Sequence, residues 1–307
     1  CLACDFDAGV ASPRFDRFMQ EVLPDEDVRE YVREYVGYTL LPDTRFQRAL
    51  FLLGGGANGK STLAEVVAAL HEKTASMTLD GLEGFKLAGL LGASLVYVDE
   101  TPARIDEQRL KSIISGGLIQ VDRKYRDPLS LRPTAKWLIL GNSLPAISDQ
   151  SLGFWRRLPV IPFSQTFPDG HADPLLSRHI QTSELSGVLN WALAGLVRLL
   201  ARGRFGVPPS AVVDAVAGGK RETNSVLAWW LARDGEVAEG VAVAKDEVYS
   251  DYRRWCLDNG MGAVSSPKFW KRLADVAGAV SETRKREAGD RRRYVNIQLP
   301  AANALPI

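Results

Sequence analysis

In the N-terminal part of the chain, apolar side chains recur at the three- and four-residue spacing of an α-helix. Ser12-Pro13 reads as an N-cap followed by proline at the first helical position. The apolar positions after it are Phe15, Phe18, Met19 and Val22, and those of a second helix ending at Gly37 are Val28, Tyr31, Val32, Tyr35 and Val36. Residues 1–45 are therefore predicted to form an N-terminal helical segment that leads into a larger domain.

From residue 46 to residue 205, short apolar runs alternate with helical stretches. The predicted strands are 49–53, 94–99, 136–141 and 157–162. A long apolar-striped helix from Glu184 to Arg202 closes this part. Strands that alternate with helices are typical of layered α/β folds, so residues 46–205 are predicted to form one α/β domain.

The C-terminal part, residues 206–307, has a different order of predicted helices and strands, and Val207-Pro208-Pro209 marks its start. After a connecting helix, helical patterns cover 225–233, 245–258 and 266–277. Two strand-like runs, 279–286 and 292–299, follow and are joined by Ala288-Gly289-Asp290. Three helices and a β-hairpin are the plan of a winged helix, so a helical linker and a winged-helix domain are expected here.

The composition is that of an ordinary globular protein. The 307 residues suffice for two domains with their own cores. Apolar residues make up 46% and charged residues 24% of the chain. The net charge of +1 excludes bulk attraction to nucleic acid, so any basic surface must be local.

We expect a cytoplasmic protein without membrane association, because no apolar run approaches the length of a membrane span and no signal peptide opens the chain. Since the chain begins at Cys1 without an initiator Met, we expect it to be a fragment of a longer protein. Cys1 and Cys4 form a C-x-x-C, but no second Cys or His pair follows at zinc-site spacing. Together with Cys256 they are expected to be free thiols in a reducing cytoplasm.

One glycine-rich stretch fits the phosphate-loop pattern G-x-x-x-x-G-K-[ST] between a predicted strand and a predicted helix. Its residues are Gly54, Gly55, Gly56, Ala57, Asn58, Gly59, Lys60, Ser61 and Thr62. Such glycines let backbone N–H groups turn inward around a triphosphate, and the helix N-terminus adds partial positive charge. Lys60 can then reach the β- and γ-phosphates, and the Ser61 hydroxyl can bind Mg²⁺. The alternative is a glycine-rich turn that binds nothing.

Polar residues follow two further predicted strands. Asp99 and Glu100 come after the apolar run 95–98. In a phosphate-loop enzyme the first acid supports Mg²⁺, and the second polarises the attacking water. The alternative is an N-capping pair for the next helix. Asn142 follows the strand 136–141 and could hold the water against the γ-phosphate, or it could be a turn residue before Pro145.

Two basic segments complete the candidate chemistry of the α/β domain. The first is Arg156 and Arg157, which could supply the arginine that stabilises transition-state charge. In ring ATPases this arginine comes from the neighbouring subunit. The alternative is a surface ion pair.

The second basic segment is a predicted hairpin. Residues 119–128 read as two short strands around a basic tip with the residues Arg123, Lys124, Tyr125 and Arg126. Cations for phosphates and an aromatic ring for a base or sugar suit single-stranded nucleic acid, whereas the alternative is a solvated hairpin tip.

A third basic segment lies near the C-terminus. Residues 284–293 hold six basic and two acidic side chains in the predicted hairpin. Lys268, Lys271 and Arg272 on the preceding helix could extend this surface. Duplex or fork DNA bound mainly through phosphates is the favoured ligand, and the alternative is a solvated wing or a protein-docking surface.

Four of these segments, in this order along the chain, resemble the superfamily 3 helicases: GGGANGKST, LVYVDE, the run 110–145 and FWRRLPVIPF. The nearest likeness is to the helicase part of phage and plasmid primase-helicases, which are related to the poxvirus helicase-primase. The likeness spans nearly the whole chain: residues 13–41 resemble the helical segment before the ATPase. The C-terminal part resembles the family's winged helix, on the residues Val248, Tyr249, Tyr252, Trp255, Cys256 and Phe269.

The resemblance implies an AAA+-like phosphate-loop ATPase core, a hexameric ring, ATP and Mg²⁺ as cofactors, and DNA in the central channel. Carried onto this chain, Lys60 and Ser61 bind phosphate and Mg²⁺, and Asp99 with Glu100 forms the acidic pair. Asn142 matches the residue that positions water; Arg157 best fits the arginine finger, with Arg156 second. Lys124 and Tyr125 fall near the DNA-contacting tip of the channel hairpin. A primase site, if there is one, lies upstream of Cys1.

These observations predict an ATP-dependent DNA helicase module of a phage or mobile-element replication protein that acts on single-stranded and forked DNA. The main rival is an initiator or loader that uses ATP to assemble on DNA without unwinding it. A structural NTPase with no nucleic-acid role is a third alternative, which the basic hairpin and winged helix make less favourable.

Overall fold

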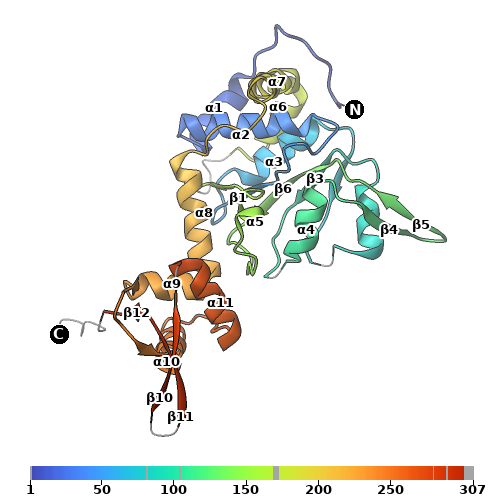
Figure 1. Ribbon diagram of the computed structural model, residues 1–307. Coiled ribbons are helices and arrows are strands. Elements are labelled where there is room, and N and C mark those ends of the chain that lie inside the picture. The colour runs from blue at the N-terminus through green and yellow to red at the C-terminus, as the bar shows by residue number, and fades with distance from the viewer. Residues whose placement is uncertain are drawn as a thin grey trace. The chain divides into compact units, whose positions relative to one another are not determined.

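The computed structural model describes residues 2–80, 82–103, 105–168, 173–278, 280–287 and 290–300, with the backbone alone for 285–287 and 290–292. It divides into two compact units, Cys1–Ala217 and Gly218–Ile307 (Figure 1). The connecting helix α8 (Ser210–Thr223) spans this division. Its residues Ala211 and Val212 pack into the core of the first unit. The domain limits at 45/46 and 205/206 remain a prediction.

A five-stranded parallel sheet organises the first unit. Its strands are β1 (Leu50–Leu53), β2 (Thr74–Ser76), β3 (Leu95–Val98), β6 (Lys136–Gly141) and β7 (Val160–Pro162). They lie in the order β2-β3-β6-β1-β7, and every neighbouring pair is parallel. The predicted α/β class is therefore confirmed, and the four predicted strands are present within one to three residues of their expected ends.

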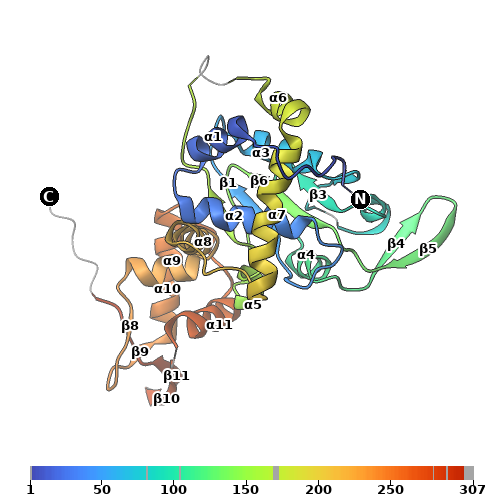
Figure 2. The same ribbon diagram turned by 90° about the horizontal axis from the view of Figure 1, so that it is seen from above.

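Helices cover both faces of this sheet, and the strand residues alternate between the two layers (Figures 1 and 2). Leu50, Leu52, Leu138 and Leu140 face the core that contains α1 (Pro13–Val22), α2 (Glu26–Thr39), α3 (Lys60–Ala69), α6 (Leu176–Ser183) and α7 (Leu185–Arg202). Phe51, Trp137 and Ile139 face the core formed with η1 (Gly84–Leu90), α4 (Glu107–Ile114) and α5 (Leu152–Trp155). Burial on both sides explains why β1 and residues 137–140 of β6 are apolar.

A separate antiparallel hairpin, β4 (Ile119–Arg123) and β5 (Arg126–Leu131), projects from this unit in both views (Figures 1 and 2). Ile119 and Val121 are buried in the core at its base. The outer part of the hairpin, by contrast, carries exposed polar and charged side chains. The fold therefore anchors the hairpin at one end and presents its tip to solvent.

Helix α7 corrects one expectation from the sequence. Its 18 residues are long and apolar enough, by length and composition, to cross a membrane. The prediction that no apolar run approaches that length was therefore wrong. In the structure α7 packs against α2, and Val188, Leu189, Ala192 and Leu199 lie in the shared core.

The N-terminus of α1 is capped differently from the sequence prediction. Pro13 is the first helical residue, as expected, but in the described part of the chain Glu184 rather than Ser12 caps the helix. One carboxylate oxygen of Glu184 accepts hydrogen bonds from the backbone N–H groups of Arg14 (3.0 Å) and Phe15 (3.1 Å). Glu184 is buried, and it lies at the start of α7, 170 residues further along the chain than Arg14. The cap therefore ties the N-terminal segment to the α/β domain.

The second unit consists of α9 (Ser225–Ala232), α10 (Lys245–Asp258) and α11 (Ser266–Ala277) with five short strands. β10 (Glu282–Glu287) pairs with β11 (Asp290–Val295), which pairs with β9 (Val243–Ala244), and β12 (Ile297–Gln298) pairs with β8 (Glu236–Val237). The rings of Trp229, Tyr252 and Phe269 form its core, with centroids 4.6–5.9 Å apart. The three helices agree with the sequence prediction to within one residue.

The strands of this unit differ more from the prediction. The run 279–286 becomes a strand only from Glu282, and the run 292–299 divides at Asn296 into β11 and β12. Most of the basic segment 284–293 lies outside the side chains that the structure describes. Arg272 is buried, at 8% exposure, and cannot extend a basic surface, whereas Lys268 and Lys271 on the same helix are exposed.

Replacing Glu184 by alanine tests the capping interaction. We expect Glu184→Ala to lower the free energy of unfolding by about 1–2 kcal/mol, the usual cost of losing a helix cap. Glu184→Gln should lose less, because its amide oxygen still accepts from the N–H groups although the charge is gone. Denaturant titration measures both, with the exposed Glu72→Ala as control. A Glu184→Ala protein as stable as that control would contradict the assignment.

Candidate nucleotide-binding site

The carboxyl ends of β1, β3 and β6 meet at one cavity of about 700 Å³. Leu53 pairs with Gly141, and Val98 pairs with Ile139, so the three strands end almost level. The residues that directly follow them line the cavity. From the phosphate loop and α3 these are Gly56, Ala57, Asn58, Gly59, Lys60, Ser61, Thr62 and Glu65; from the other two strands they are Asp99, Glu100, Thr101, Gly141, Asn142 and Ser143. Parallel pairing therefore brings together the polar residues predicted from the sequence.

The loop between β1 and α3 has the backbone of a phosphate-binding loop. Gly56, Ala57 and Gly59 have φ angles of +104°, +47° and +85°, and α3 begins at Lys60. Gly54 and Gly55 lead into this turn. Alternation between left- and right-handed conformations points successive N–H groups inward and forms a nest for an anion. The N-terminus of α3 opens onto the same space and adds its partial positive charge.

Gly59 is required by packing as well as by its backbone angle. A Cβ atom at this position would lie 2.6 Å from Cγ1 of Val22 and 3.0 Å from Cε2 of Phe18. Both side chains belong to α1, which therefore rests directly on the phosphate loop. A left-handed φ already costs about 1–2 kcal/mol for any residue except glycine. The N-terminal segment and the loop thus fit together only with glycine here.

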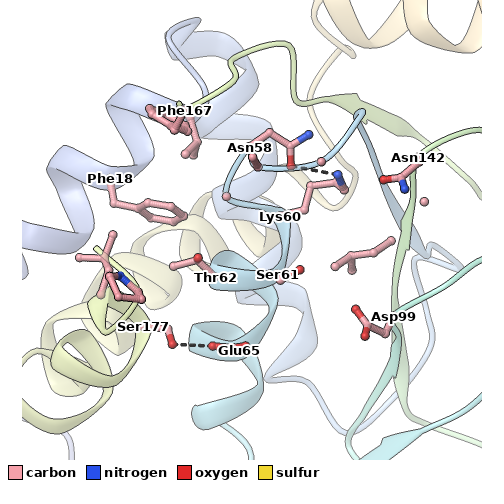
Figure 3. Close-up of a pocket in the computed structure, with 18 of the residues that line it drawn as sticks. Phe18, Asn58, Lys60, Ser61, Thr62, Glu65, Asp99, Asn142, Phe167 and Ser177 are labelled. Atoms are coloured by element: carbon pink, nitrogen blue, oxygen red, sulfur yellow. Dashed lines mark hydrogen bonds between the residues drawn. The ribbon is translucent and has the colours of Figure 1, made fainter. Parts of the chain in front are cut away.

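Lys60 folds back across the loop (Figure 3). Its ammonium donates to the carbonyl of Gly54 at 2.6 Å and to Oδ1 of Asn58 at 2.9 Å. The amide of Asn58 in turn donates to the carbonyl of Phe163 at 3.4 Å. Lys60 is only 6% exposed, and its burial lowers the pKa of the ammonium. Because both of these partners are neutral, an anion that entered the cavity would be a stronger partner for this cation.

The acidic residues lie opposite the loop. Asp99 and Glu100 are both exposed to the cavity, and Oδ1 of Asp99 accepts a hydrogen bond from the hydroxyl of Tyr97 at 2.7 Å. The hydroxyl of Thr101 donates to the carbonyl of Leu140 at 2.6 Å, which fastens the acidic turn to β6. Since β6 lies between β1 and β3, Asn142 at its end stands between the phosphate loop and the acids (Figure 3).

The donor set of this cavity suits a Mg²⁺ ion that arrives with a nucleotide. Mg²⁺ prefers oxygen ligands and usually takes one or two from protein and the rest from phosphate and water. Ser61 and Asp99 offer a hydroxyl and a carboxylate on facing sides of the cavity (Figure 3). Within the described residues, no group of three or more His, Cys, Asp or Glu side chains could hold a metal unaided. A cation here would therefore depend on phosphate oxygens for its remaining ligands.

The other side of the cavity contains residues that the sequence analysis did not identify. Its apolar part consists of Phe18, Val22, Phe167 and Leu176. Nearby, the hydroxyl of Ser177 donates to the carboxylate of Glu65 and links α6 to α3 (Figure 3). An apolar wall beside a phosphate site is what the base and ribose of a nucleotide need. Phe18 and Val22 were predicted only as apolar positions of a helix, and Phe167 and Leu176 follow the sheet about 150 residues later, so no signal in the sequence marked the four as one wall.

Arg156 and Arg157 do not line this cavity in the described part of the chain. Arg156 is exposed, and Arg157 is half-buried. The guanidinium of Arg157 donates to Ser115 Oγ at 2.9 Å, to Gln47 Oε1 at 2.8 Å and to the carbonyl of Gly153. The structure therefore does not bring either arginine to the cavity of its own chain.

The four predicted DNA-contacting residues gather at the tip of the β4–β5 hairpin, away from the cavity. Tyr125 is 94% exposed, and the ammonium of Lys124 lies 5.5 Å from the centroid of its ring. Arg126 is also exposed, whereas the guanidinium of Arg123 donates to the carbonyl of Asp127 at 2.9 and 3.1 Å. The tip thus offers two exposed cations and an exposed aromatic ring, while Arg123 braces the turn.

The comparisons with known proteins relate this chain to viral proteins. Over 166 residues, 49% of this chain and 17% of the relative, it is 32% identical to "Putative helicase L207/L206" of Acanthamoeba polyphaga mimivirus. Over 282 residues, 82% of this chain and 29% of the relative, it is 24% identical to "Putative helicase 022R" of Frog virus 3 (isolate Goorha). The chain spans less than a third of the length of either relative.

Two further comparisons concern residues 52–157 and the fold. Residues 52–157 match a protein family of unknown function, DUF5906, and this stretch runs from β1 to Arg157. Among solved structures, the apo C-terminal region of NrS-1 superposes with a TM-score of 0.59 at 13% identity, covering 96% of this chain and 79% of that chain. At this identity the likeness concerns the fold alone. The chain is thus similar in sequence to viral proteins named as helicases and in fold to the C-terminal region of NrS-1.

Proposed function

We propose that this chain is the ATP-dependent helicase module of a DNA replication protein from a virus, phage or other mobile element. The observation that carries the proposal is the meeting of Lys60, Ser61, Asp99, Glu100 and Asn142 at one cavity. This set combines groups that can bind phosphate, oxygen ligands for a cation, and a carboxylate that can accept a proton from the attacking water. The names of the viral relatives support a helicase over other phosphate-loop enzymes.

In this proposal the residues divide the work of ATP hydrolysis. The loop N–H groups and the Lys60 ammonium hold the phosphates and neutralise charge that develops on the γ-phosphate. Ser61 and Asp99 hold Mg²⁺, which when bound draws charge from the phosphate oxygens. Glu100 accepts the proton of the attacking water, and the Asn142 amide orients that water. Phe18, Val22 and Phe167 bury the base and sugar.

We further propose a homo-oligomeric ring, with a hexamer expected from the family resemblance. The arginine finger would then act on the nucleotide of the neighbouring subunit, since neither arginine lines the cavity of its own chain. Arg157 fits the family pattern best, but its guanidinium already has three acceptors in its own chain. Arg156 is more exposed and has a longer contact, with Gln47 Oε1 at 3.5 Å, so exposure favours Arg156 as the finger.

Mixing variants tests this arrangement. Arg156→Ala alone should bind ATP and hydrolyse it at least about 100-fold more slowly, because a finger contributes a factor of this size or more. Mixed with Lys60→Ala subunits, it should regain part of the turnover at hybrid interfaces. Size-exclusion chromatography of the mixture establishes co-assembly. Co-assembled subunits without any recovery would contradict action across a subunit boundary.

For the DNA contacts we propose the tip of the β4–β5 hairpin, with Lys124 and Arg126 on phosphates and Tyr125 against a base or sugar. We also propose an AAA+-like core at 46–205, preceded by a helical segment at 1–45 and followed by a helical linker and winged helix at 206–307. A primase domain of the full-length protein, if there is one, would lie upstream of this chain, and we propose a cytoplasmic location. The rival function, a loader that binds DNA without unwinding it, uses the same residues.

Strand displacement tests the proposed function and separates it from its rival. The wild-type chain should displace one strand of a forked duplex while it hydrolyses ATP. Lys60→Ala should abolish both and weaken nucleotide binding, because the phosphates lose their cation. Glu100→Gln should bind ATP normally but lose turnover by a factor of about 100 or more, since its amide cannot take the proton.

The outcomes discriminate between the alternatives. Turnover that DNA stimulates without strand displacement would favour the loader. Turnover that DNA leaves unchanged would favour an NTPase with no nucleic-acid role. Near-normal turnover by Glu100→Gln would remove that residue from catalysis.

The hairpin tip makes an independent prediction. Lys124→Ala should reduce stimulation of turnover by single-stranded DNA and lower the salt dependence of DNA binding by about one charge. Tyr125→Ala should weaken binding by about 1–3 kcal/mol through the lost stacking. Basal hydrolysis should stay near normal in both, because the tip lies outside the cavity. The exposed Lys73→Ala serves as the charge-matched control. An equal loss of basal turnover would show a structural role instead.

A further inference from the structure

Tyr97 stands between the two residues proposed to hold Mg²⁺. It lies on β3 two positions before Asp99, so the strand alternation turns both side chains toward the same face of the sheet. Leu95, on this face, packs in the core with α3, whereas Val96 and Val98 face the opposite core. Tyr97 is half-buried against the α3 side. The ring thus lies between the strand that ends in Asp99 and the helix that begins with Lys60 and Ser61.

The hydroxyl of Tyr97 has a hydrogen-bond partner at this place, Oδ1 of Asp99, at 2.7 Å. A carboxylate can only accept, so Tyr97 donates its single proton to Asp99.

This hydrogen bond prepares Asp99 for a cation. Asp99 commits one lone pair of Oδ1 to Tyr97, which fixes the plane of the carboxylate and leaves Oδ2 available. Partners that orient metal ligands in this way usually contribute about 10–100-fold to metal affinity.

We propose that Tyr97 is a positioning residue of the Mg²⁺ site: its hydroxyl orients the carboxylate of Asp99 toward the cation that Asp99 and Ser61 would share. The inference rests on the proposed nucleotide site and adds to it a residue that does not itself touch the phosphates. The alternative is that Tyr97 only fills space beneath α3.

The environment keeps this hydroxyl protonated. Burial, the hydrogen bond to Asp99 and the nearby negative charges of Asp99 and Glu65 raise the pKa of Tyr97 above its ordinary value. Phenylalanine at this position would keep the ring and its packing and remove only the hydrogen bond to Asp99.

Equilibrium binding of a non-hydrolysable ATP analogue, with Mg²⁺ and with EDTA, tests the proposal without relying on turnover. In wild type, Mg²⁺ should increase the affinity for the analogue. In Tyr97→Phe this gain should fall about tenfold, while the affinity in EDTA stays at the wild-type value. In turnover assays the Mg²⁺ concentration for half-maximal rate should rise by a similar factor, with a smaller change of kcat at saturating Mg²⁺.

Tyr31→Phe is the matched control, because the Tyr31 hydroxyl also has a partner, Arg48 at 2.9 Å, but lies on α2 away from the cavity lining. It should leave the Mg²⁺ dependence unchanged. If wild type gains affinity from Mg²⁺ and Tyr97→Phe gains as much or more, the positioning role is overturned and the nucleotide site stands. If wild type binds no nucleotide under either condition, the proposed function fails together with this inference.

Discussion

In the sheet of the first unit, β6 pairs in parallel with β1 on one side and with β3 on the other. Almost everything described above depends on these two pairings. The N–H of Gly54, just past β1, donates to the carbonyl of Gly141 at the end of β6, so the phosphate loop and Asn142 start from adjacent points. β3 delivers Asp99 to the same edge. The strands stay in this register because their residues are buried on both faces, and a shift by one position would exchange the two sets of packed side chains.

The N-terminal segment is part of this arrangement and contributes directly to the site. Phe18 and Val22 of α1 rest on Gly59 and also line the cavity. Glu184 holds the first turn of α1 from the start of α7, and the Tyr35 hydroxyl on α2 donates to the carbonyl of Trp137 on β6. The helical segment therefore connects the phosphate loop, the central strand and α7. Because Phe18 and Val22 pack on Gly59, a movement of the phosphate loop toward a nucleotide would also require α1 to move.

The sequence predicted those parts of the structure that local patterns specify. Apolar runs such as 136–141, bounded by turns, identify buried strands, and the loop from Gly54 to Thr62 is defined by its own residue types and by its neighbours. Strand β2 was missed because Thr74–Ser76 is three residues long and lies at the sheet edge, where only Ala75 is buried. The cap by Glu184 and the wall formed with Phe167 were also missed. They join segments more than 100 residues apart, and nothing within either segment reveals the partner.

The backbone conformation at the tip of the β4–β5 hairpin disfavours the residue that is found there. Tyr125 has a φ of +59°, in the left-handed region where glycine or asparagine would be at less cost, and its ring is 94% exposed. The backbone strain of about 1–2 kcal/mol is not offset by burial of the ring. Folding alone would thus select a different residue at this position. A tyrosine at this position therefore lowers the local stability of the hairpin, which is the pattern expected where a side chain is kept for contact with another molecule.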